Sequence, residues 1–162
     1  MKVAVITCSN RSAAGQRPDD SGELLSALLT GAGHEVVVRT IVPDDITRIR
    51  DAVDVALQAG ADAVLTTGGT GITPTDVTPE AVHPLFEREI PGLAEAIRLV
   101  ARDTVPTSVL SRGVAGSIGT SLIVTLPGSP GGVRDGMGVL LPILEHAVDQ
   151  LGGGDHLPGG GV

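Results

Sequence analysis

Short apolar runs alternate with helical patterns along this chain, and the alternation restricts the fold more than any other feature. Apolar residues, many of them β-branched, fill residues 3–6, 36–38, 63–65 and 122–124 without a polar interruption. Continuous apolar runs are typical of strands buried on both faces, as in a parallel sheet. Because helical patterns lie between the runs, the order predicts an α/β fold with three layers (α/β/α), a mostly parallel sheet and right-handed crossovers.

Two amphipathic helices are predicted before residue 61. Asp20 and Glu23 have the spacing of a capping box, so the first helix is expected to begin at Asp20 and to end near Gly31. The second helix is expected to end at Gly60, because glycine favours the end of a helix. The apolar stripes of the two helices contain Leu24, Leu25, Leu28, Leu29, Ile46, Ile49, Val53 and Leu57.

The second half of the chain is also rich in helical patterns. Residues 78–103 show one that is interrupted near Pro91, and residues 132–151 are expected to form the last helix. Residues 108–115 fit either a strand or one arm of a hairpin. The glycine-rich residues 152–162 have almost nothing to bury, so we expect a folded domain over residues 1–151 and a mobile tail.

Composition and charge exclude several classes of function. The net charge of −8 and the lack of a Lys/Arg cluster argue against a nucleic-acid partner. The N-terminal apolar run is too short for a signal peptide or a membrane span. With Cys8 as the single cysteine, these features favour a soluble cytoplasmic protein that binds no membrane. Phe86 is the only aromatic residue, so the core is expected to be aliphatic.

Glycines are concentrated directly after the predicted strand at residues 63–65, in the sequence LTTGGTG. Glycine allows positive φ and lets a ligand approach bare backbone N–H groups, as in an anion-binding loop. A tight turn would need only one glycine. No Gly-Lys-Ser/Thr follows, which excludes a Walker loop, and Pro74 replaces the third glycine of a dinucleotide fingerprint. The candidate phosphate-binding residues are Thr67, Gly68, Gly69, Thr70 and Gly71.

Aspartates follow two of the predicted strands. Thr78 and Pro79 are interpreted as the start of a helix with Thr78 as its N-cap, which leaves Asp76 without a capping role. A local turn could still satisfy the Asp76 carboxylate. Of Asp44 and Asp45, one is expected to cap the second helix. The only loop cations available near these sites are Arg11, Arg112 and Arg134. A divalent cation held by carboxylates would therefore help to neutralise a polyphosphate.

Other reactive side chains carry weaker signals. Cys8 follows the first predicted strand and is expected to be a small buried packing residue rather than a nucleophile. The histidines have no metal-ligand spacing and are expected at edges or on the surface; they are His34, His83, His146 and His156. The sequence contains no G-x-S-x-G elbow for a hydrolytic serine.

Several blocks in a fixed order resemble the molybdopterin-binding family, which includes the molybdenum cofactor biosynthesis proteins MoaB and MogA and a domain of gephyrin. The blocks are residues 66–71, 76–81, 108–112 and 126–130. The resemblance covers about Lys2 to Gln150 and implies the three-layer fold of that family. It also implies a homotrimer or, as in some MoaB-like members, a hexamer, and a downstream partner that inserts molybdate.

The activity that the resemblance implies is adenylylation of molybdopterin by Mg-ATP, with release of pyrophosphate. Asp44 and Asp76 match the two catalytic aspartates of the family and are implied to hold Mg²⁺. Beside the glycine loop, the resemblance and the strand-end loops give a further set of candidate substrate-binding residues. They are Ser9, Ser111, Arg112, Pro127, Gly128 and Ser129.

The sequence departs from the family pattern at two positions. Many relatives have an arginine where this chain has Thr75, and Ser-Asp-Arg where it has an asparagine at position 10. A non-catalytic molybdopterin-binding or scaffold paralogue is therefore the alternative function. A nucleotide- or flavin-binding switch domain is a third interpretation, which rests on fold analogy alone.

Overall fold

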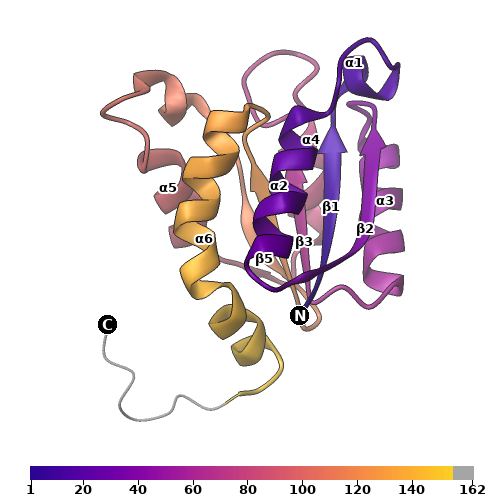
Figure 1. Ribbon diagram of the computed structural model, residues 1–162, viewed down its shortest axis with the longest axis vertical. Coiled ribbons are helices and arrows are strands. Elements are labelled where there is room, and N and C mark those ends of the chain that lie inside the picture. Colours follow the sequence, from indigo (N-terminus) through magenta and orange to yellow (C-terminus); the bar gives the residue numbers. More distant parts are fainter. Residues whose placement is uncertain (155–162) are drawn as a thin grey trace.

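The computed structural model contains one six-stranded sheet between two layers of helices (Figure 1). The structure describes residues 1–154. The strand order is β2-β1-β3-β6-β5-β4. The first four of these are parallel, and β5 and β4 are antiparallel to their neighbours. The predicted mostly parallel sheet is thus confirmed. The strands are β1 Lys2–Cys8, β2 Glu35–Val42, β3 Ala63–Thr67, β4 Arg88–Glu89, β5 Ala115–Ile118 and β6 Ser121–Leu126.

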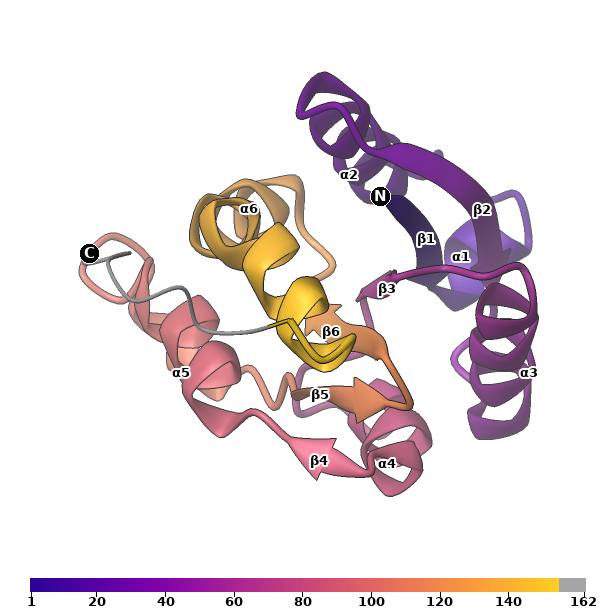
Figure 2. The ribbon, with the colours of Figure 1, turned by 90° about the horizontal axis from the view of Figure 1, so that it is seen from below.

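Helices cover both faces of the sheet (Figure 2). The α-helices are α1 Asn10–Ala13, α2 Asp20–Gly31, α3 Ile46–Gln58, α4 Thr78–Val82, α5 Pro91–Leu99 and α6 Pro130–Leu151, and the 3₁₀ helices are η1 His83–Leu85 and η2 Pro106–Leu110. Val3 and Val5 pack into one core with α2, α5 and α6, whereas Ala4 and Ile6 pack into a second core with α3 and α4. Successive strand residues point to opposite faces. The continuous apolar runs therefore fill both cores.

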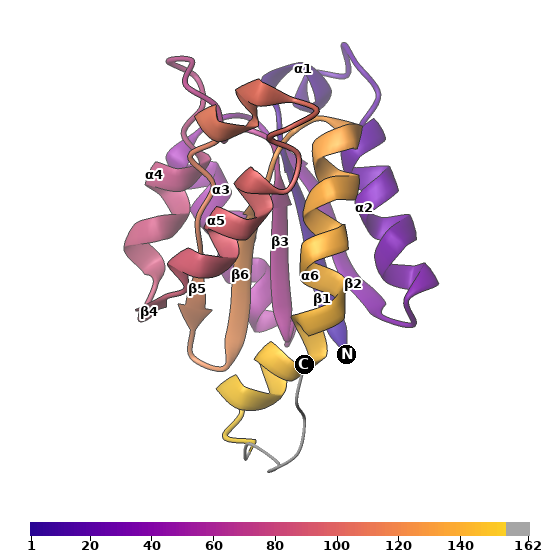
Figure 3. The same ribbon diagram turned by 90° about the vertical axis from the view of Figure 1, so that its left-hand side faces the viewer.

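The parallel strands bring the loops that follow them to one edge of the sheet, at the top of Figure 3. Thr7 pairs in register with Thr67, and Thr67 pairs with Leu126. The chain therefore leaves β1, β3 and β6 at neighbouring points. In open α/β sheets, ligands bind outside this carboxyl edge.

The structure corrects the start of the first predicted helix. Asp19, rather than Asp20, is the N-cap of α2, and its carboxylate accepts a hydrogen bond from the Gly22 amide at 3.0 Å. The same carboxylate accepts the hydroxyl of Thr7 at 3.0 Å and the guanidinium of Arg39 at 3.3 Å. These tertiary contacts select Asp19 as the cap.

The predicted helix over residues 78–103 is wrong in its middle. Helix α4 ends at Val82, and Arg88–Glu89 forms the short strand β4 that pairs with β5. Pro91 begins α5 instead of interrupting a helix, because proline is compatible with the first turn. The strand or hairpin arm predicted for residues 108–115 is also corrected. The arm is β5, which starts only at Ala115, whereas residues 108–110 belong to η2 and residues 111–114 form neither helix nor strand.

The burial of the histidines only partly agrees with the prediction from the sequence. His34, which was expected at an edge or on the surface, is buried with 7% exposure, whereas His83 and His146 are exposed. His156 and most of the predicted tail lie outside the described residues. None of the helices in residues 1–154 is long and apolar enough to cross a membrane.

Candidate functional site

The glycine loop after β3 needs glycine because neighbouring groups press on its backbone. Gly68 and Gly69 have φ of 96° and 64°, a region that favours glycine. A Cβ at Gly68 would lie 2.3 Å from the carbonyl oxygen of Cys8, and one at Gly69 would lie 2.3 Å from Oγ1 of Thr78. At Gly71 it would lie 2.7 Å from Oδ2 of Asp76. These glycines are therefore needed in the first place for packing, because a side chain at any of them would collide with a neighbouring group.

The same loop leaves backbone donors free. The Gly68 amide donates to the Leu126 carbonyl at 3.1 Å. Within residues 1–154, the structure gives no acceptor to the amides of Gly69, Thr70 and Gly71. All three residues line a cavity. Consecutive free amides beside a cavity suit an anion, as the sequence predicted.

Thr78 has a different role from the predicted one. The N-cap of α4 is Val77, which makes no side-chain capping bond. The buried Thr78 hydroxyl donates instead to the carbonyl of Gly68 at 2.9 Å, and the Thr78 amide donates to the carbonyl of Gly69 at 3.0 Å. Thr78 therefore fixes the glycine loop to α4.

Asp44 and Asp45 divide the two roles that the sequence left open. Asp45 caps α3 through a 2.9 Å hydrogen bond from the Arg48 amide. Asp44 pairs with Asn10: its Oδ2 accepts the Asn10 amide at 2.9 Å, and its own amide donates to Oδ1 of Asn10 at 3.0 Å. Oδ1 of Asp44 is buried and has no hydrogen-bond partner in the described residues. A buried carboxylate oxygen without a partner is costly, so it marks a place for a donor or a cation.

Asp76 is partly engaged in a local turn. Its Oδ2 accepts the Thr73 amide at 2.9 Å and the Thr73 hydroxyl at 2.7 Å. The local turn that the sequence left open as an alternative role for Asp76 therefore exists, but it uses only Oδ2 of the carboxylate. The side chain is half-buried and lies between two cavities. Asp76 can thus belong to the turn and still present Oδ1 to a ligand.

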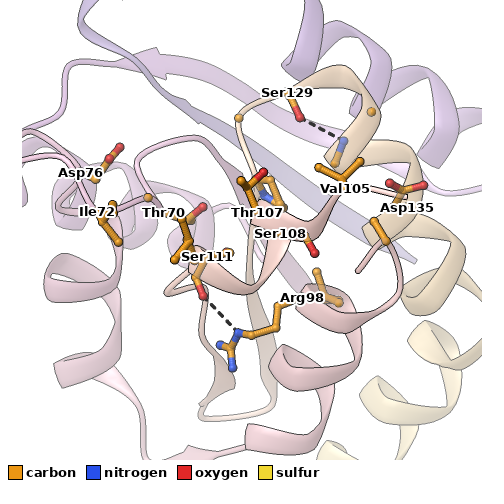
Figure 4. Close-up of a pocket in the computed structure, with 18 of the residues that line it drawn as sticks. Thr70, Ile72, Asp76, Arg98, Val105, Thr107, Ser108, Ser111, Ser129 and Asp135 are labelled. Carbon is orange, nitrogen blue, oxygen red and sulfur yellow. Dashed lines mark hydrogen bonds between the residues drawn. The ribbon is translucent and has the colours of Figure 1, made fainter. Parts of the chain in front are cut away.

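A large cavity of about 550 Å³ lies on one side of the glycine loop (Figure 4). Its walls come from the loop itself, from α5 and η2, and from the N-terminal turn of α6. Ile97, Val105 and Leu110 make much of the surface apolar. The predicted residues that line it are Gly69, Thr70, Gly71, Asp76, Ser111, Pro127, Gly128 and Ser129.

A small cavity of about 390 Å³ lies on the other side, between the glycine loop and the segment after β1. Two arginines line it, Arg11 and Arg17. The predicted residues found there are Ser9, Asp44, Thr67, Gly68, Gly69, Asp76 and Gly128. The residues common to the two cavities are Gly69, Thr73, Asp76 and Gly128. The cavities therefore meet at the glycine loop, with Asp76 at their boundary.

Loops from β1 and β6 hold the walls of the cavities in place. Ser9 caps α1 and Ser129 caps α6, where it accepts the Gly132 amide at 3.1 Å. The hydroxyl of Thr67 donates to the Pro127 carbonyl at 2.7 Å. A Cβ at Gly128 would lie 3.0 Å from Cα of Gly68. The two glycine-containing loops are therefore in direct backbone contact.

Arg112 lies outside both cavities, unlike its neighbour Ser111. It donates to backbone carbonyls of the glycine loop and forms an ion pair with Glu80. The hydrogen bonds from Arg112 hold the pKa of Glu80 below its usual range. Arg134 is exposed and lines neither cavity. Of the loop cations named from the sequence, only Arg11 therefore lies where a polyphosphate would need one.

Some cavity residues escaped the sequence analysis. Arg98 lines the large cavity and donates to the carbonyls of Ser111 at 3.1 Å and Gly113 at 2.8 Å. Asp135, on the first turns of α6, lines the same cavity. Arg17, which lines the small cavity, was also missed, although it lies in the polar segment between α1 and α2 that follows the first strand. Arg98 and Asp135 have no local signal, because both lie within helices that the sequence marks only by their apolar faces.

Cys8 is a packing residue, as expected. It is buried with 3% exposure, and its core neighbours include Ala4 and Ile6. Burial raises the pKa of the thiol to about 12, and Asp44 adds to the shift, although a hydrogen bond with Thr78 opposes it. The reactive thiolate form is therefore scarce at neutral pH.

Metal binding by protein groups alone is not supported by the described residues, in which no three His, Cys, Asp or Glu side chains are grouped for it. Mg²⁺ is usually held by one or two carboxylates together with substrate phosphates. The unpartnered Oδ1 of Asp44, beside the cavity that Asp76 also lines, fits that kind of site.

Comparison with known proteins agrees with this geometry. The sequence model described as "Probable molybdopterin binding domain" matches residues 4–146. The chain belongs to the molybdopterin-binding family. The chain is 41% identical to a protein of Pyrococcus furiosus named molybdopterin adenylyltransferase, and the match covers 90% of each chain. The crystal structure of the molybdopterin biosynthesis enzyme MoaB from Thermus thermophilus is 42% identical, with a TM-score of 0.88, and the match covers 94% of this chain and 96% of that one.

Some relatives in this family are longer than this chain. The chain is 38% identical to a molybdenum cofactor biosynthesis bifunctional protein of Synechococcus elongatus over 95% of its own length, but it spans only 48% of that relative. The predicted family and fold are confirmed. The contact of each candidate residue with a ligand stays a prediction.

Proposed function

We propose that this protein adenylylates molybdopterin with Mg-ATP and releases pyrophosphate. The observation that carries the proposal is the pair of cavities that meet at Gly69, Thr73, Asp76 and Gly128. A transfer between two substrates needs adjoining compartments, with the reacting groups held at their boundary. The name of the 41% identical relative from Pyrococcus furiosus supports the same reaction.

The proposed reaction is a displacement at phosphorus. A terminal phosphate oxygen of molybdopterin forms a bond to the α-phosphorus of ATP, and the bond from that phosphorus to the oxygen bridging to the β-phosphate breaks. Pyrophosphate leaves with the electron pair of the broken bond. Such transfers depend mainly on positioning and on neutralisation of charge.

The chain's own residues would supply much of that positioning. The free amides of Gly69, Thr70 and Gly71 would donate to phosphate oxygens, and Arg11 and Arg17 would add positive charge in the small cavity. Asp44 and Asp76 would hold Mg²⁺ through the carboxylate oxygens that have no protein partner. When bound, Mg²⁺ would supply the charge that the two carboxylates cannot. The apolar wall of the large cavity suits the pterin ring system of the substrate. Aliphatic side chains of the wall would contact the ring in place of stacked aromatic side chains.

The proposal extends to assembly and to the next step of the pathway. We propose a homotrimer, or a hexamer, that passes the adenylylated product to a molybdate-inserting protein. Light scattering coupled to size-exclusion chromatography would measure the mass of the assembly.

The test of the reaction uses purified protein, molybdopterin, Mg²⁺ and ATP labelled at the α-phosphate. Labelled adenylyl-molybdopterin should form, and it should not form with Asp44→Asn or when Mg²⁺ is removed by a chelator. Failure of the wild-type protein to label competent molybdopterin would exclude the proposed activity.

A binding or scaffold function is the second candidate, because Asp76 is already engaged by Thr73 in a local turn. This alternative predicts that Asp76→Asn leaves molybdopterin binding intact while no turnover is detected in any variant. It is refuted if the wild type turns over and Asp76→Asn abolishes that turnover.

A further inference from the structure

Arg112 holds the glycine loop without lining the large cavity. Its amide donates to the Thr70 carbonyl at 2.7 Å, its Nε donates to the Gly71 carbonyl at 2.7 Å, and its Nη2 donates to the Asp76 carbonyl at 2.6 Å. Its guanidinium also pairs with the Glu80 carboxylate. One residue therefore connects both ends of the segment 70–76 to α4.

The geometry of the peptide unit links these contacts to the cavity. In a trans peptide, the carbonyl of one residue and the N–H of the next point in opposite directions. Because the carbonyls of Thr70 and Gly71 are directed at Arg112, the amides of Gly71 and Ile72 are directed away from it. Gly71 and Ile72 both line the large cavity, and Arg112 does not. The guanidinium therefore fixes the peptide that carries the Ile72 amide, whereas the Gly71 amide is oriented through the backbone N–H of Arg112.

The fork of the guanidinium suits this role. It presents several N–H donors in a rigid plane, so it can bind separate carbonyls and a carboxylate at once. Glu80 lies on α4, which Arg50 also binds through the carbonyls of Ala81 at 2.9 Å and Glu80 at 3.2 Å. The carboxylate that accepts Arg112 is thus on an element with independent support.

We propose that the Arg112 side chain, with Glu80 as its anchor, is a positioning group that keeps the Gly71–Ile72 peptide and Asp76 aligned beside the two cavities. The inference rests on the proposed function for its effect on turnover. Its structural part, the ordering of residues 70–76, can be tested without any substrate.

The substrate-free test compares Arg112→Ala with Arg50→Ala by hydrogen exchange. Arg50→Ala is a matched control, because it also removes arginine-to-carbonyl hydrogen bonds at α4 but contacts none of residues 70–76. The amides of Thr73 and Asp76 form hydrogen bonds inside the loop, so they report its order. We expect Arg112→Ala to speed their exchange at least about tenfold, with β3 amides unchanged. Unchanged exchange, or equal loosening in Arg50→Ala, would overturn the proposal.

The second part of the test measures turnover and its rescue. We expect Arg112→Ala to lower kcat/KM roughly 10- to 100-fold, as displacement of groups near the reacting atoms does. Arg112→Lys should be close to the alanine variant, because an ammonium lacks the planar fork. Guanidinium ion at millimolar concentration, but not ammonium ion, should restore both loop protection and turnover in Arg112→Ala.

The possible results separate the two proposals. Full activity of Arg112→Lys, or rescue by ammonium, would mean that charge alone matters and would overturn the positioning role. An effect on KM for ATP alone, with loop exchange unchanged, would make Arg112 a ligand contact and would also overturn it. If the wild type does not adenylylate molybdopterin, the proposed function fails, but the exchange measurements still decide whether Arg112 orders the loop.

Discussion

Substitution of Gly69 by alanine tests the packing of the glycine loop. Gly69 has φ of 64°, and a Cβ there would lie 2.3 Å from Oγ1 of Thr78 and 3.1 Å from Oδ1 of Asp44. The buried Thr78 hydroxyl cannot remain in place, so its hydrogen bond to the Gly68 carbonyl would break. The added methyl group would also press on the carboxylate proposed to hold a cation.

The cost can be estimated from two effects. Alanine in the left-handed region costs about 1–2 kcal/mol relative to glycine. Loss of the Thr78 hydrogen bond, with a buried carbonyl left unpaired, costs about 1–3 kcal/mol. Reduced freedom of the unfolded chain offsets about 0.4–1 kcal/mol of this. The net loss in the free energy of unfolding is therefore about 1–4.6 kcal/mol, centred at about 3 kcal/mol, and the central value corresponds to roughly 6–12 °C in Tm for a chain of this size.

Gly119→Ala is a control that separates the steric clash of the new Cβ from the cost of alanine at positive φ. Gly119 also has positive φ, 56°, but a Cβ there would meet nothing within 4 Å. Denaturant unfolding should give Gly119→Ala a loss of only about 1 kcal/mol. In a Thr78→Ala background, Gly69→Ala should cost less than in the wild type, because the colliding hydroxyl is gone, but still more than Gly119→Ala, because Oδ1 of Asp44 lies 3.1 Å from the new Cβ. Equal costs for Gly69→Ala and Gly119→Ala in the wild-type background would refute the reasoning.

Other parts of the site give further expected outcomes. Arg17→Ala should weaken the binding of Mg-ATP measured by calorimetry, most strongly at low salt, whereas the exposed Arg134→Ala, outside both cavities, should not. Asp45→Ala should lower the free energy of unfolding by about 1 kcal/mol through loss of the α3 cap, with turnover unchanged, because Asp45 lines neither cavity. The pKa of Cys8 rises from 9.0 to about 12 in the fold, so the unfolded chain loses this proton first as pH rises. That contribution to stability is complete below pH 9 and is lost between about pH 9 and 12, by at most about 1.4 kcal/mol per pH unit; Cys8→Ala should remove this part of the slope in urea unfolding.

The central strands could be predicted because strands buried on both faces have continuous apolar sequences. Strand β4 could not, because Arg88 and Glu89 are exposed and form a strand only through pairing with β5. The apolar spacing of residues 78–103 fits a helical region interrupted only near Pro91. The pairing of β4 with β5 overrides that local preference.

The candidate site divides in a similar way. Loops that follow strands were expected at one edge of the sheet, and the structure brings Asp44 and Asp76 to the same small cavity there. The local capping rule predicts Thr78 as a helix cap, but its partner is the Gly68 carbonyl, which only the fold brings near. The family resemblance places Arg112 among the substrate-binding residues. Its observed partners at positions 71, 76 and 80 could not be predicted, because they lie far along the chain, where no spacing rule applies.

The family resemblance implies an arginine at position 75, and the threonine found there has a physical interpretation in this loop. Thr75 lies at the rim of the small cavity, and its hydroxyl is 3.2 Å from that of Thr73. The donors beside the large cavity belong to the backbone, whose carbonyls are held by Thr78 and Arg112 from outside both cavities. A change of side chain at position 75 therefore leaves those donors in place and removes only positive charge. Because Arg11 and Arg17 line the same small cavity as Thr75, they can supply that charge from the segment after β1. A threonine at position 75 is thus compatible with phosphate binding at this site.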